Sequence, residues 1–384
     1  MNILMLTSAM IDSHFAMYQE RANVKPNPSN QNFYSKLIKC LAKRNNVAVV
    51  TLRPFVKGMF KEKTLDEENS SVDGVRYFYS RVQSGRLYKM FGCQNDVMRA
   101  AREAIASFQS NEFVIITDTI RLNLIRAANK LGEIYHVKVV GMLTDNPLNL
   151  ANILPSYATS LSKEVVKCDA FLSLTQKLVD NIDPDADSYV FDGLVMDEVP
   201  AKKGPISNYF FFAGHLAERY GVKALVDGFH NSNCRSKLII AGTGSLQKHV
   251  DKVVANDSRI LYLSQISKDK VIAYEKDAIA NINPRPLNDS LDKESVPSKL
   301  IEYLSIGTPT ISTKFPKIYK LFTNELTWIE DYSAPGIARA LEEFERANIE
   351  EKKEKALIAK KKAFELYSLD SQSESITHFL NSIQ

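Results

Sequence analysis

The sequence lacks the long apolar run that a membrane-spanning helix requires. No stretch of eighteen apolar residues occurs in its 384 residues, and the opening Met1–Ser8 is too short and lacks the charged flank of a signal peptide. Low-complexity segments and internal repeats are also missing, and 45% hydrophobic with 24% charged residues is the composition of an ordinary globular protein. We therefore expect a cytoplasmic protein, and its length indicates two domains.

Cysteine and histidine patterns are equally sparse. The four cysteines, Cys40, Cys93, Cys168 and Cys234, form no C-x-x-C pair, and the six histidines show no metal-binding spacing such as H-E-x-x-H. These absences argue against a zinc site and against a disulfide framework. We expect buried thiols in a reducing compartment, no metal and no bound cofactor.

Strand-like and helix-like patterns alternate along both halves of the chain. The strands predicted in the first half are Ile3–Leu6, Val47–Leu52, Val75–Tyr79, Phe113–Thr117, Val137–Leu143, Ala170–Leu174 and Ser188–Phe191. Those of the second half are Tyr209–Phe212, Lys237–Ile240, Ile260–Leu263, Ala280–Ile282 and Thr310–Ser312. This alternation predicts an α/β protein with two doubly wound, Rossmann-like parallel sheets, whose ligands bind beyond the carboxyl ends of the strands.

A segment without periodicity separates the two halves. Asp197–Pro205 contains two prolines and has the composition of a linker. We predict an N-terminal domain over residues 1–200 and a C-terminal domain over residues 201–365. The remaining residues, 366–384, form a predicted helix with apolar residues at helical spacing, which we expect to pack back on the N-terminal domain.

The most informative stretch runs from Asn283 to Ser312. Pro297 suits the first position of a helix, so Ser298 and Lys299 lie in that helix's first turn, where free N–H groups and the helix dipole favour a phosphate. Glu302 lies four residues after Ser298, on the same face, where its carboxylate can accept two hydrogen bonds from a vicinal diol such as ribose. Leu300 lies between them, and Glu294 lies in the approach loop.

This stretch resembles glycosyltransferase family 4, a family of retaining enzymes with the GT-B fold. Glu294 and Glu302 match its E-x7-E motif, and Pro297–Pro309 resembles members that build bacterial capsule, exopolysaccharide or O-antigen. The resemblance implies two Rossmann-like domains that face a cleft, and transfer of a sugar from a nucleotide diphosphate. The alternative is a surface helix with incidental acids.

Two further loops are similar to the donor domain of the same family. Gly214 and His215 follow one predicted strand, and Gly242 and Gly244 follow the next. Many members carry Arg and Lys where this chain has His215 and Tyr220, so the usual diphosphate-neutralising cations are missing.

The available substitutes are Arg219, Lys299 and Arg285, because a diphosphate leaving group needs donors aimed at its developing charge. A surface arginine is the alternative reading for Arg219.

The N-terminal half is expected to contact the acceptor. Asn30, Gln31 and Asn32 replace the glycine-rich turn that family members often have, although Asn30 also suits a helix N-cap. Asp145 follows a predicted strand and is a candidate for acceptor binding or sugar positioning, with turn formation before Pro147 as the alternative.

A D-x-D pattern also occurs, but it does not predict a metal site. Asp183, Asp185 and Asp187 lie between a predicted helix and a predicted strand, with a proline among them, so they indicate a turn. The resemblance also implies that the diphosphate is neutralised without metal.

From these residues we predict a glycosyltransferase that uses a UDP-sugar. Glu294 and Asp145 are the predicted catalytic residues, Glu302 the ribose anchor, and the acceptor a saccharide or a polyprenyl-diphosphate-linked saccharide. Rival readings are a nucleotide-sugar 2-epimerase and a non-catalytic nucleotide-sugar-binding subunit. A dehydrogenase is the least favoured, because no G-x-G-x-x-G follows the first strand.

Positive charge is concentrated near the N-terminus. Residues 1–110 carry 16 Lys or Arg against 9 Asp or Glu, a local balance of +7, whereas the whole chain has a net charge of +4. A solvated helix face and attraction to an anionic membrane surface or a phosphorylated lipid both account for this excess. No nucleic-acid motif accompanies it.

Overall fold

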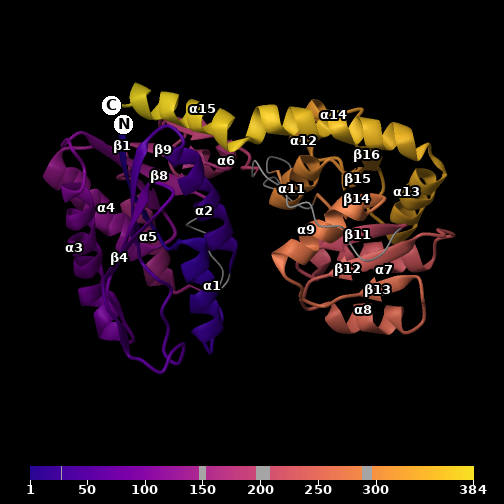
Figure 1. Ribbon diagram of the computed structural model, residues 1–384, viewed down its shortest axis with the longest axis horizontal. Coiled ribbons are helices and arrows are strands. Elements are labelled where there is room, and N and C mark those ends of the chain that lie inside the picture. The colour runs from indigo at the N-terminus through magenta and orange to yellow at the C-terminus, as the bar shows by residue number, and fades with distance from the viewer. Residues whose placement is uncertain (27, 147–152, 196–207, 288–295) are drawn as a thin grey trace. The chain divides into compact units, whose positions relative to one another are not determined.

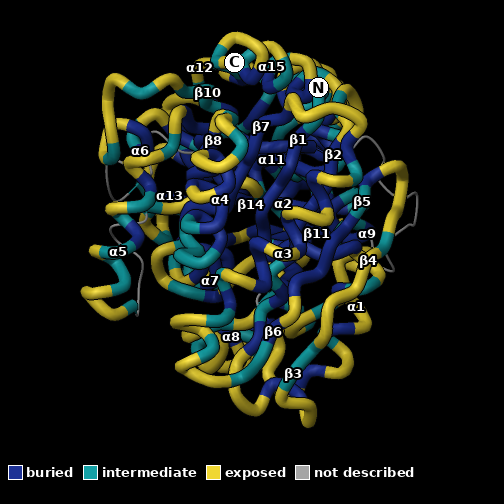
Figure 2. The backbone as a smooth tube through the Cα atoms, turned by 90° about the vertical axis from the view of Figure 1, so that its left-hand side faces the viewer, coloured by how far each residue is buried: buried dark blue, intermediate teal, exposed yellow. Residues whose placement is uncertain are grey.

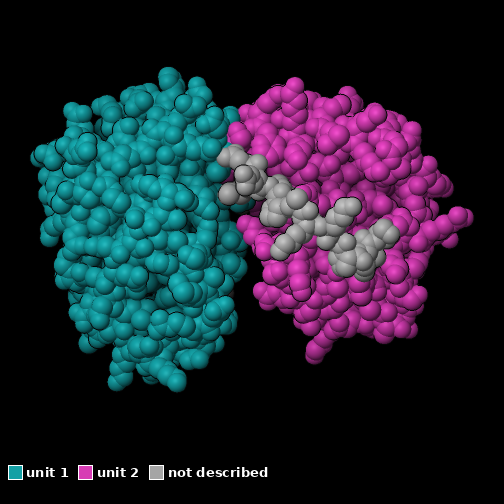
Figure 3. All heavy atoms as spheres, viewed as in Figure 1, with its two compact units in different colours: residues 1–191, 369–384 teal, residues 192–368 magenta. Residues whose placement is uncertain are grey.

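The computed structural model describes residues 1–26, 28–146, 153–195, 208–287 and 296–384. They form two compact units: unit 1 comprises Met1–Phe191 and Leu369–Gln384, and unit 2 comprises Asp192–Ser368 (Figure 3). The linker predicted over Asp197–Pro205 lies outside the described residues. None of the described helices is long and apolar enough to cross a membrane.

Unit 1 is built on an eight-stranded sheet with the order β10-β9-β8-β7-β1-β2-β5-β4 (Figure 1). Its strands are β1 (Asn2–Thr7), β2 (Asn46–Thr51), β4 (Glu68–Val72), β5 (Val75–Tyr79), β7 (Phe113–Asp118), β8 (Val139–Leu143), β9 (Ala170–Ser173) and β10 (Ser188–Val190). All neighbours are parallel except β4, which forms an antiparallel hairpin with β5. A separate antiparallel ribbon joins β3 (Thr64–Leu65) and β6 (Val82–Gln83).

Helices cover both faces of this sheet. They are α1 (Asp12–Arg21), α2 (Pro28–Ala42), a π-helical turn (Tyr88–Gly92), α3 (Cys93–Ala106), α4 (Leu122–Tyr135), α5 (Pro155–Val165), α6 (Gln176–Asp180) and α15 (Leu369–Ser382). The C-terminal helix α15 belongs to unit 1. It packs against α2 near the N-terminus, and the Cys40 thiol donates to the carbonyl of Leu369.

Helix α1 is absent from the sequence-based prediction, which has only loop between the first strand and Gln31. The reason is its weak apolar pattern, since only Phe15 and Tyr18 on this helix are buried. Tertiary contacts stabilise it instead: the Tyr18 hydroxyl donates to the carbonyl of Pro54 at 2.5 Å, and its ring packs edge-on against Phe60.

Unit 2 contains a six-stranded, fully parallel sheet with the order β13-β12-β11-β14-β15-β16. Its strands are β11 (Tyr209–Ala213), β12 (Lys237–Ala241), β13 (Ile260–Tyr262), β14 (Ala280–Asn283), β15 (Thr310–Thr313) and β16 (Thr327–Ile329). Its helices are η2 (Glu218–Tyr220, a 3-10 turn), α7 (Val222–His230), α8 (Gln247–Val254), α9 (Lys268–Asp277), α11 (Ser298–Ile306), α12 (Pro316–Leu321), α13 (Ala334–Arg346) and α14 (Ile349–Tyr367). The central strands of both sheets are buried (Figure 2), as near-continuous apolar runs in parallel sheets require, whereas the antiparallel edge strand β4 is mostly exposed.

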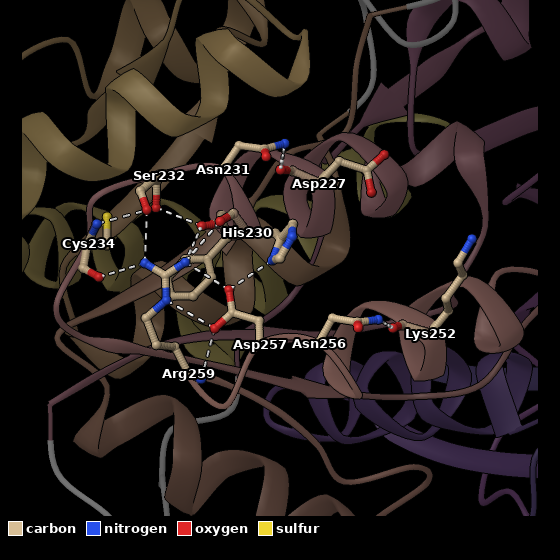
Figure 4. Close-up of polar contacts among 10 residues, drawn as sticks. Asp227, His230, Asn231, Ser232, Cys234, Lys252, Asn256, Asp257 and Arg259 are labelled. Atoms are coloured by element: carbon tan, nitrogen blue, oxygen red, sulfur yellow. Dashed lines mark hydrogen bonds and ion pairs between the residues drawn. The ribbon is translucent and has the colours of Figure 1, made fainter.

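One arginine ties together the loops at the amino end of the second sheet. Arg259 donates to the carbonyl oxygens of Ser232, Cys234 and His230, all at 2.9 Å, and so satisfies carbonyls at the end of α7 and in the loop that follows it (Figure 4). Asp257 pairs with the same guanidinium at 2.7 Å. The hydrogen bonds that Asp257 accepts, above all the one from the Arg259 side chain, lower its pKa to about 2. The cluster lies at the edge opposite the carboxyl ends, so we assign it a structural role.

Candidate functional site

Three loops of unit 2 meet at the carboxyl ends of β11, β12 and β14. The Leu216 N–H donates to the carbonyl of Thr243 at 2.9 Å, and the Leu246 N–H returns a bond of 2.9 Å to the carbonyl of Leu216. Gly242 has φ +135°, and a Cβ there would lie 1.9 Å from the Gly214 carbonyl oxygen. A Cβ on Gly244 would lie 2.3 Å from the carbonyl oxygen of Leu216. Only glycine therefore allows the first two loops to approach this closely.

A third glycine joins the first loop to the loop after β14. Gly221 has φ +74°, and a Cβ there would lie 2.1 Å from the Pro284 carbonyl oxygen. Because Gly221 also precedes α7, the contact fixes both the start of that helix and the position of the adjacent residue, Tyr220.

The ring of Tyr220 is the meeting point of three predicted donor-site residues. The Arg219 guanidinium lies 5.3 Å from the ring centroid, and that of Arg285 lies 5.7 Å from it. The His215 ring packs edge-on with its centroid 6.0 Å away. The two arginines are 66 positions apart in the sequence, yet both stack on one aromatic residue. Two guanidinium groups beside one ring bring positive charge to the carboxyl edge of the sheet, where a diphosphate needs it.

Helix α11 begins at Ser298, directly after Pro297. The first intrahelical bonds are donated by the N–H groups of Leu300 and Ile301 to the carbonyl of Pro297, so those of Ser298 and Lys299 lie outside the helical ladder. Ser298 is exposed, as a phosphate contact would require. The Leu300 side chain is fully buried in an apolar cluster and its N–H donates to the carbonyl of Pro297; its contact with the donor stays a prediction.

The predicted phosphate ligand Lys299 is engaged by two carboxylates. Its Nζ lies 2.5 Å from Glu275 Oε1 and 3.2 Å from Glu302 Oε2. Glu275, on α9, is completely buried, and this burial raises its pKa to about 7 despite the neighbouring ammonium. Lys299 therefore orients Glu302 and contributes less net positive charge to a phosphate than the two arginines do.

A buried tyrosine links α11 to the first glycine loop. The Tyr303 hydroxyl accepts a hydrogen bond from the N–H of Ala213, the last residue of β11, at 3.4 Å. The first turn of α11 is thereby positioned beside the loop that contains Gly214 and His215. Neither Tyr303 nor Glu275 could be identified from the sequence. A tyrosine and a glutamate on amphipathic helices carry no local signal, since their partners lie on other elements.

The three residues of unit 1 that we predicted to contact the acceptor have different structural roles. The Gln31 amide is buried, accepts from the Met10 N–H at 2.9 Å and donates to the Met10 carbonyl at 2.8 Å. It therefore holds the loop after β1. Asn30 lies within the first turn of α2, which begins at Pro28, so its prediction as a helix N-cap was wrong. The roles of Asn30, Gln31 and Asn32 towards an acceptor stay predictions.

Asp145 lies at the carboxyl end of β8, near an acid that the sequence analysis did not single out. Asp118 ends β7, is completely buried, and lies 3.4 Å from the Nε of Arg121. Burial raises the pKa of Asp118, and the Asp145 charge adds to that increase. Asp145 itself is exposed. Its predicted partner in catalysis, Glu294, lies outside the described residues.

No cluster of three metal-ligating side chains occurs among the residues that the structure describes. The D-x-D segment forms a turn, in which the N–H of Asp185 donates to the side chain of Asp183 at 3.1 Å.

Comparison with known proteins places the described geometry in context. Residues 197–364 match the family model for glycosyl transferases group 1. A search of the curated proteins finds no match.

Similar solved structures include Anabaena HepE in complex with UDP and glucose, with 12% identity, 100% of both chains covered and a TM-score of 0.65. Burkholderia xenovorans trehalose-phosphate synthase (UDP-forming), in complex with glucose-6-phosphate, has 10% identity, 99% coverage of both chains and a TM-score of 0.69. Thermosynechococcus elongatus sucrose-phosphate synthase has 13% identity, 100% coverage of both chains and a TM-score of 0.65. Identities this low show the fold alone.

Proposed function

We propose that this chain, which has the GT-B fold and whose residues 197–364 form a group 1 glycosyltransferase domain, transfers a hexose-type sugar from UDP to a saccharide or lipid-linked saccharide acceptor. The observation that carries the proposal is the arrangement of Arg219 and Arg285 on the ring of Tyr220, at the carboxyl edge of the sheet. UDP is favoured as the nucleotide because HepE is described in complex with UDP and glucose.

In the proposed reaction the sugar keeps its anomeric configuration. The acceptor hydroxyl oxygen bonds to the anomeric carbon on the face that the diphosphate leaves. The bond from that carbon to the β-phosphate oxygen breaks, and the hydroxyl proton passes to the departing diphosphate. Arg219 and Arg285 stabilise the charge that develops on the diphosphate, without a metal. Glu302 accepts the ribose hydroxyls, and Ser298 donates to a phosphate oxygen.

The biological role that we propose is the synthesis of a bacterial surface polysaccharide such as capsule, exopolysaccharide or O-antigen. It is supported by the resemblance of Pro297–Pro309 to enzymes of that kind. The reaction would take place at the inner face of the plasma membrane if the acceptor is a polyprenyl-diphosphate-linked saccharide, and the excess positive charge of residues 1–110 suits such an acceptor.

Titration of UDP into the protein by calorimetry tests the donor site. Hydrogen bonds to charged groups contribute about 1.5–3 kcal/mol each, so Glu302→Ala, Arg219→Ala and Arg285→Ala should each weaken UDP binding about 10- to 100-fold. Arg346→Ala and Glu354→Ala are matched controls, because both are exposed residues of unit 2 outside the three loops. Wild-type affinity in a folded Glu302→Ala variant would contradict the ribose assignment.

Product analysis then separates transfer from its alternatives. The protein is incubated with UDP-glucose and a mixture of acceptors, and the sugar products are resolved by chromatography. A glycosylated acceptor supports the proposal. A changed sugar still attached to UDP would support an epimerase, and unchanged UDP-glucose despite tight binding would support a non-catalytic subunit.

A further inference from the structure

A pocket lies in unit 1, at the carboxyl ends of its parallel strands. Its volume is about 810 Å³, within the range of small-molecule sites. Its walls come from the segments after β2 and β6, the π-helical turn Tyr88–Gly92, and the first turns of α4 and α5. All of its lining residues belong to unit 1 and are described. Doubly wound sheets bind ligands at this edge.

The charge of the pocket wall is of one sign. Five lining residues are basic and none is acidic: Arg53, Arg86, Lys89, Arg121 and Arg126. The Arg53 side chain already has a backbone partner, because its guanidinium donates to the carbonyl of Ser80 at 3.1 Å. Arg121 forms an ion pair with Asp118, and Arg126 forms one with Glu164. Within the described part of the chain, neither Arg86 nor Lys89 forms an ion pair, so their charge faces solvent and the pocket mouth.

Large apolar side chains stand beside these cations. Leu87 is 74% exposed, Phe91 68%, Leu154 67% and Met90 57%, and the last three line the pocket. Three of the four fall within five consecutive residues that also contain Lys89. Exposed apolar side chains gathered beside a pocket mark a binding surface rather than chance exposure. Two of them lie on the π-helical turn, a rare element that frequently occurs at functional sites.

We propose that this pocket binds a lipid-linked saccharide acceptor through its lipid chain and through the phosphate or diphosphate that joins the lipid to the saccharide. Its phosphate lies against Arg86, Lys89 and Arg121, and its hydrocarbon chain lies along Met90, Phe91 and Leu154. The inference rests on the proposed function, for which it names the acceptor class and the binding site. A free saccharide would leave the apolar wall in water, and a bare membrane surface would engage the rim without filling a concave volume of about 810 Å³.

Calorimetric titration with farnesyl diphosphate, a short soluble polyprenyl diphosphate, tests the pocket. We expect binding that is at least tenfold tighter than that of inorganic pyrophosphate or of farnesol, because each of these carries only one of the two recognised parts. The double variant Arg86→Ala/Lys89→Ala should weaken farnesyl diphosphate binding at least tenfold, and Phe91→Ser should weaken it while leaving pyrophosphate binding unchanged. All of these residues are exposed, so the fold is preserved.

The control is Arg102→Ala, an exposed arginine of α3 that does not line the pocket. Equal losses in the control and the double variant would show general charge attraction and overturn the proposal. Wild-type protein that binds phosphatidylglycerol vesicles through the same residues, but shows no affinity for farnesyl diphosphate, would identify a membrane contact and overturn it as well.

UDP titrations of the same variants separate this proposal from the proposed function. UDP affinity should be unchanged in the double variant, since its residues lie in unit 1. A wild-type protein that binds UDP but not farnesyl diphosphate overturns the pocket and leaves the donor site intact. The reverse result, farnesyl diphosphate binding that depends on Arg86 and Lys89 without any UDP binding, supports the pocket and contradicts the donor assignment.

Discussion

Replacing Gly242 by alanine tests whether the close approach of two backbone loops creates the donor site. The new Cβ would lie 1.9 Å from the Gly214 carbonyl oxygen, whereas real Cβ atoms essentially never come closer than 3.0 Å to another heavy atom. The loop after β11 must therefore move by about 1 Å or more. Overpacking of this kind costs about 1–3 kcal/mol, and the unfavourable φ of +135° adds about 1–3 kcal/mol.

The expected result is a combined loss of about 2–6 kcal/mol, shared between stability and donor binding. Because about 1.4 kcal/mol corresponds to a tenfold change, we expect UDP affinity to fall more than tenfold and the melting temperature to fall as well. Calorimetric titration with UDP and thermal denaturation measure the two effects on the same samples.

Gly74→Ala is the matched control. Gly74 also has a positive φ of +79°, but a Cβ there would have no heavy atom within 4 Å. It should lower stability by about 1–2 kcal/mol through backbone strain alone and leave UDP affinity unchanged. Wild-type UDP affinity in a folded Gly242→Ala variant would refute the reasoning, because the site would then tolerate displacement of its first loop.

Three further predictions concern Arg259, Asp257 and Glu275 of unit 2. Arg259→Ala should destabilise the protein by about 3 kcal/mol or more, since it leaves several carbonyl groups without a donor; urea denaturation measures this, and an unchanged midpoint would contradict the clamp. The pKa of Asp257 is about 2 in the folded protein, below the ordinary 3.8 of an aspartate, so its stabilisation is present above pH 4 and is lost as the pH falls through 2. Glu275 has the opposite sign: its pKa of about 7 exceeds the ordinary 4.5, so the folded state binds more protons and stability falls as the pH rises from about 4.5 to 7. Glu275→Gln should flatten that slope in melting curves recorded from pH 5 to 8, whereas parallel curves for both proteins would show that the Lys299 contact cancels the effect of burial.

Local patterns were enough to predict most of the architecture. Parallel strands buried on both faces must be continuous apolar runs, so the central strands of both sheets could be predicted directly, and β5 has the predicted bounds, Val75–Tyr79. Among the elements that were missed, α1 has a weak apolar pattern and β4 is mostly exposed, whereas α13 was missed although its buried Ile337, Leu341 and Phe344 recur at helical spacing. Besides α1, the short β16 and the helix α13 fall in a stretch for which the sequence analysis predicted no element.

The glycines at the strand ends and the start of α11 could also be predicted from the sequence. A glycine after a buried strand marks a turn that a Cβ would disturb, and the structure shows the contact that each Cβ would make at Gly242 and Gly244. Pro297 indicated the start of α11, which lies within one residue of the expected position. These are short-range features, for which a few neighbouring residues contain all the required information.

What the sequence by itself determined is therefore the alternation of strands and helices, the turns at the strand ends and the helix that carries Glu302. Only the tertiary structure decided which charges meet. It stacked Arg219 and Arg285 on one tyrosine and engaged Lys299 with the buried Glu275. It also assembled one basic and apolar pocket from four separate stretches of the sequence. The physical reason is that a charge depends on the partners and the burial that the fold supplies, and neither is encoded in neighbouring residues.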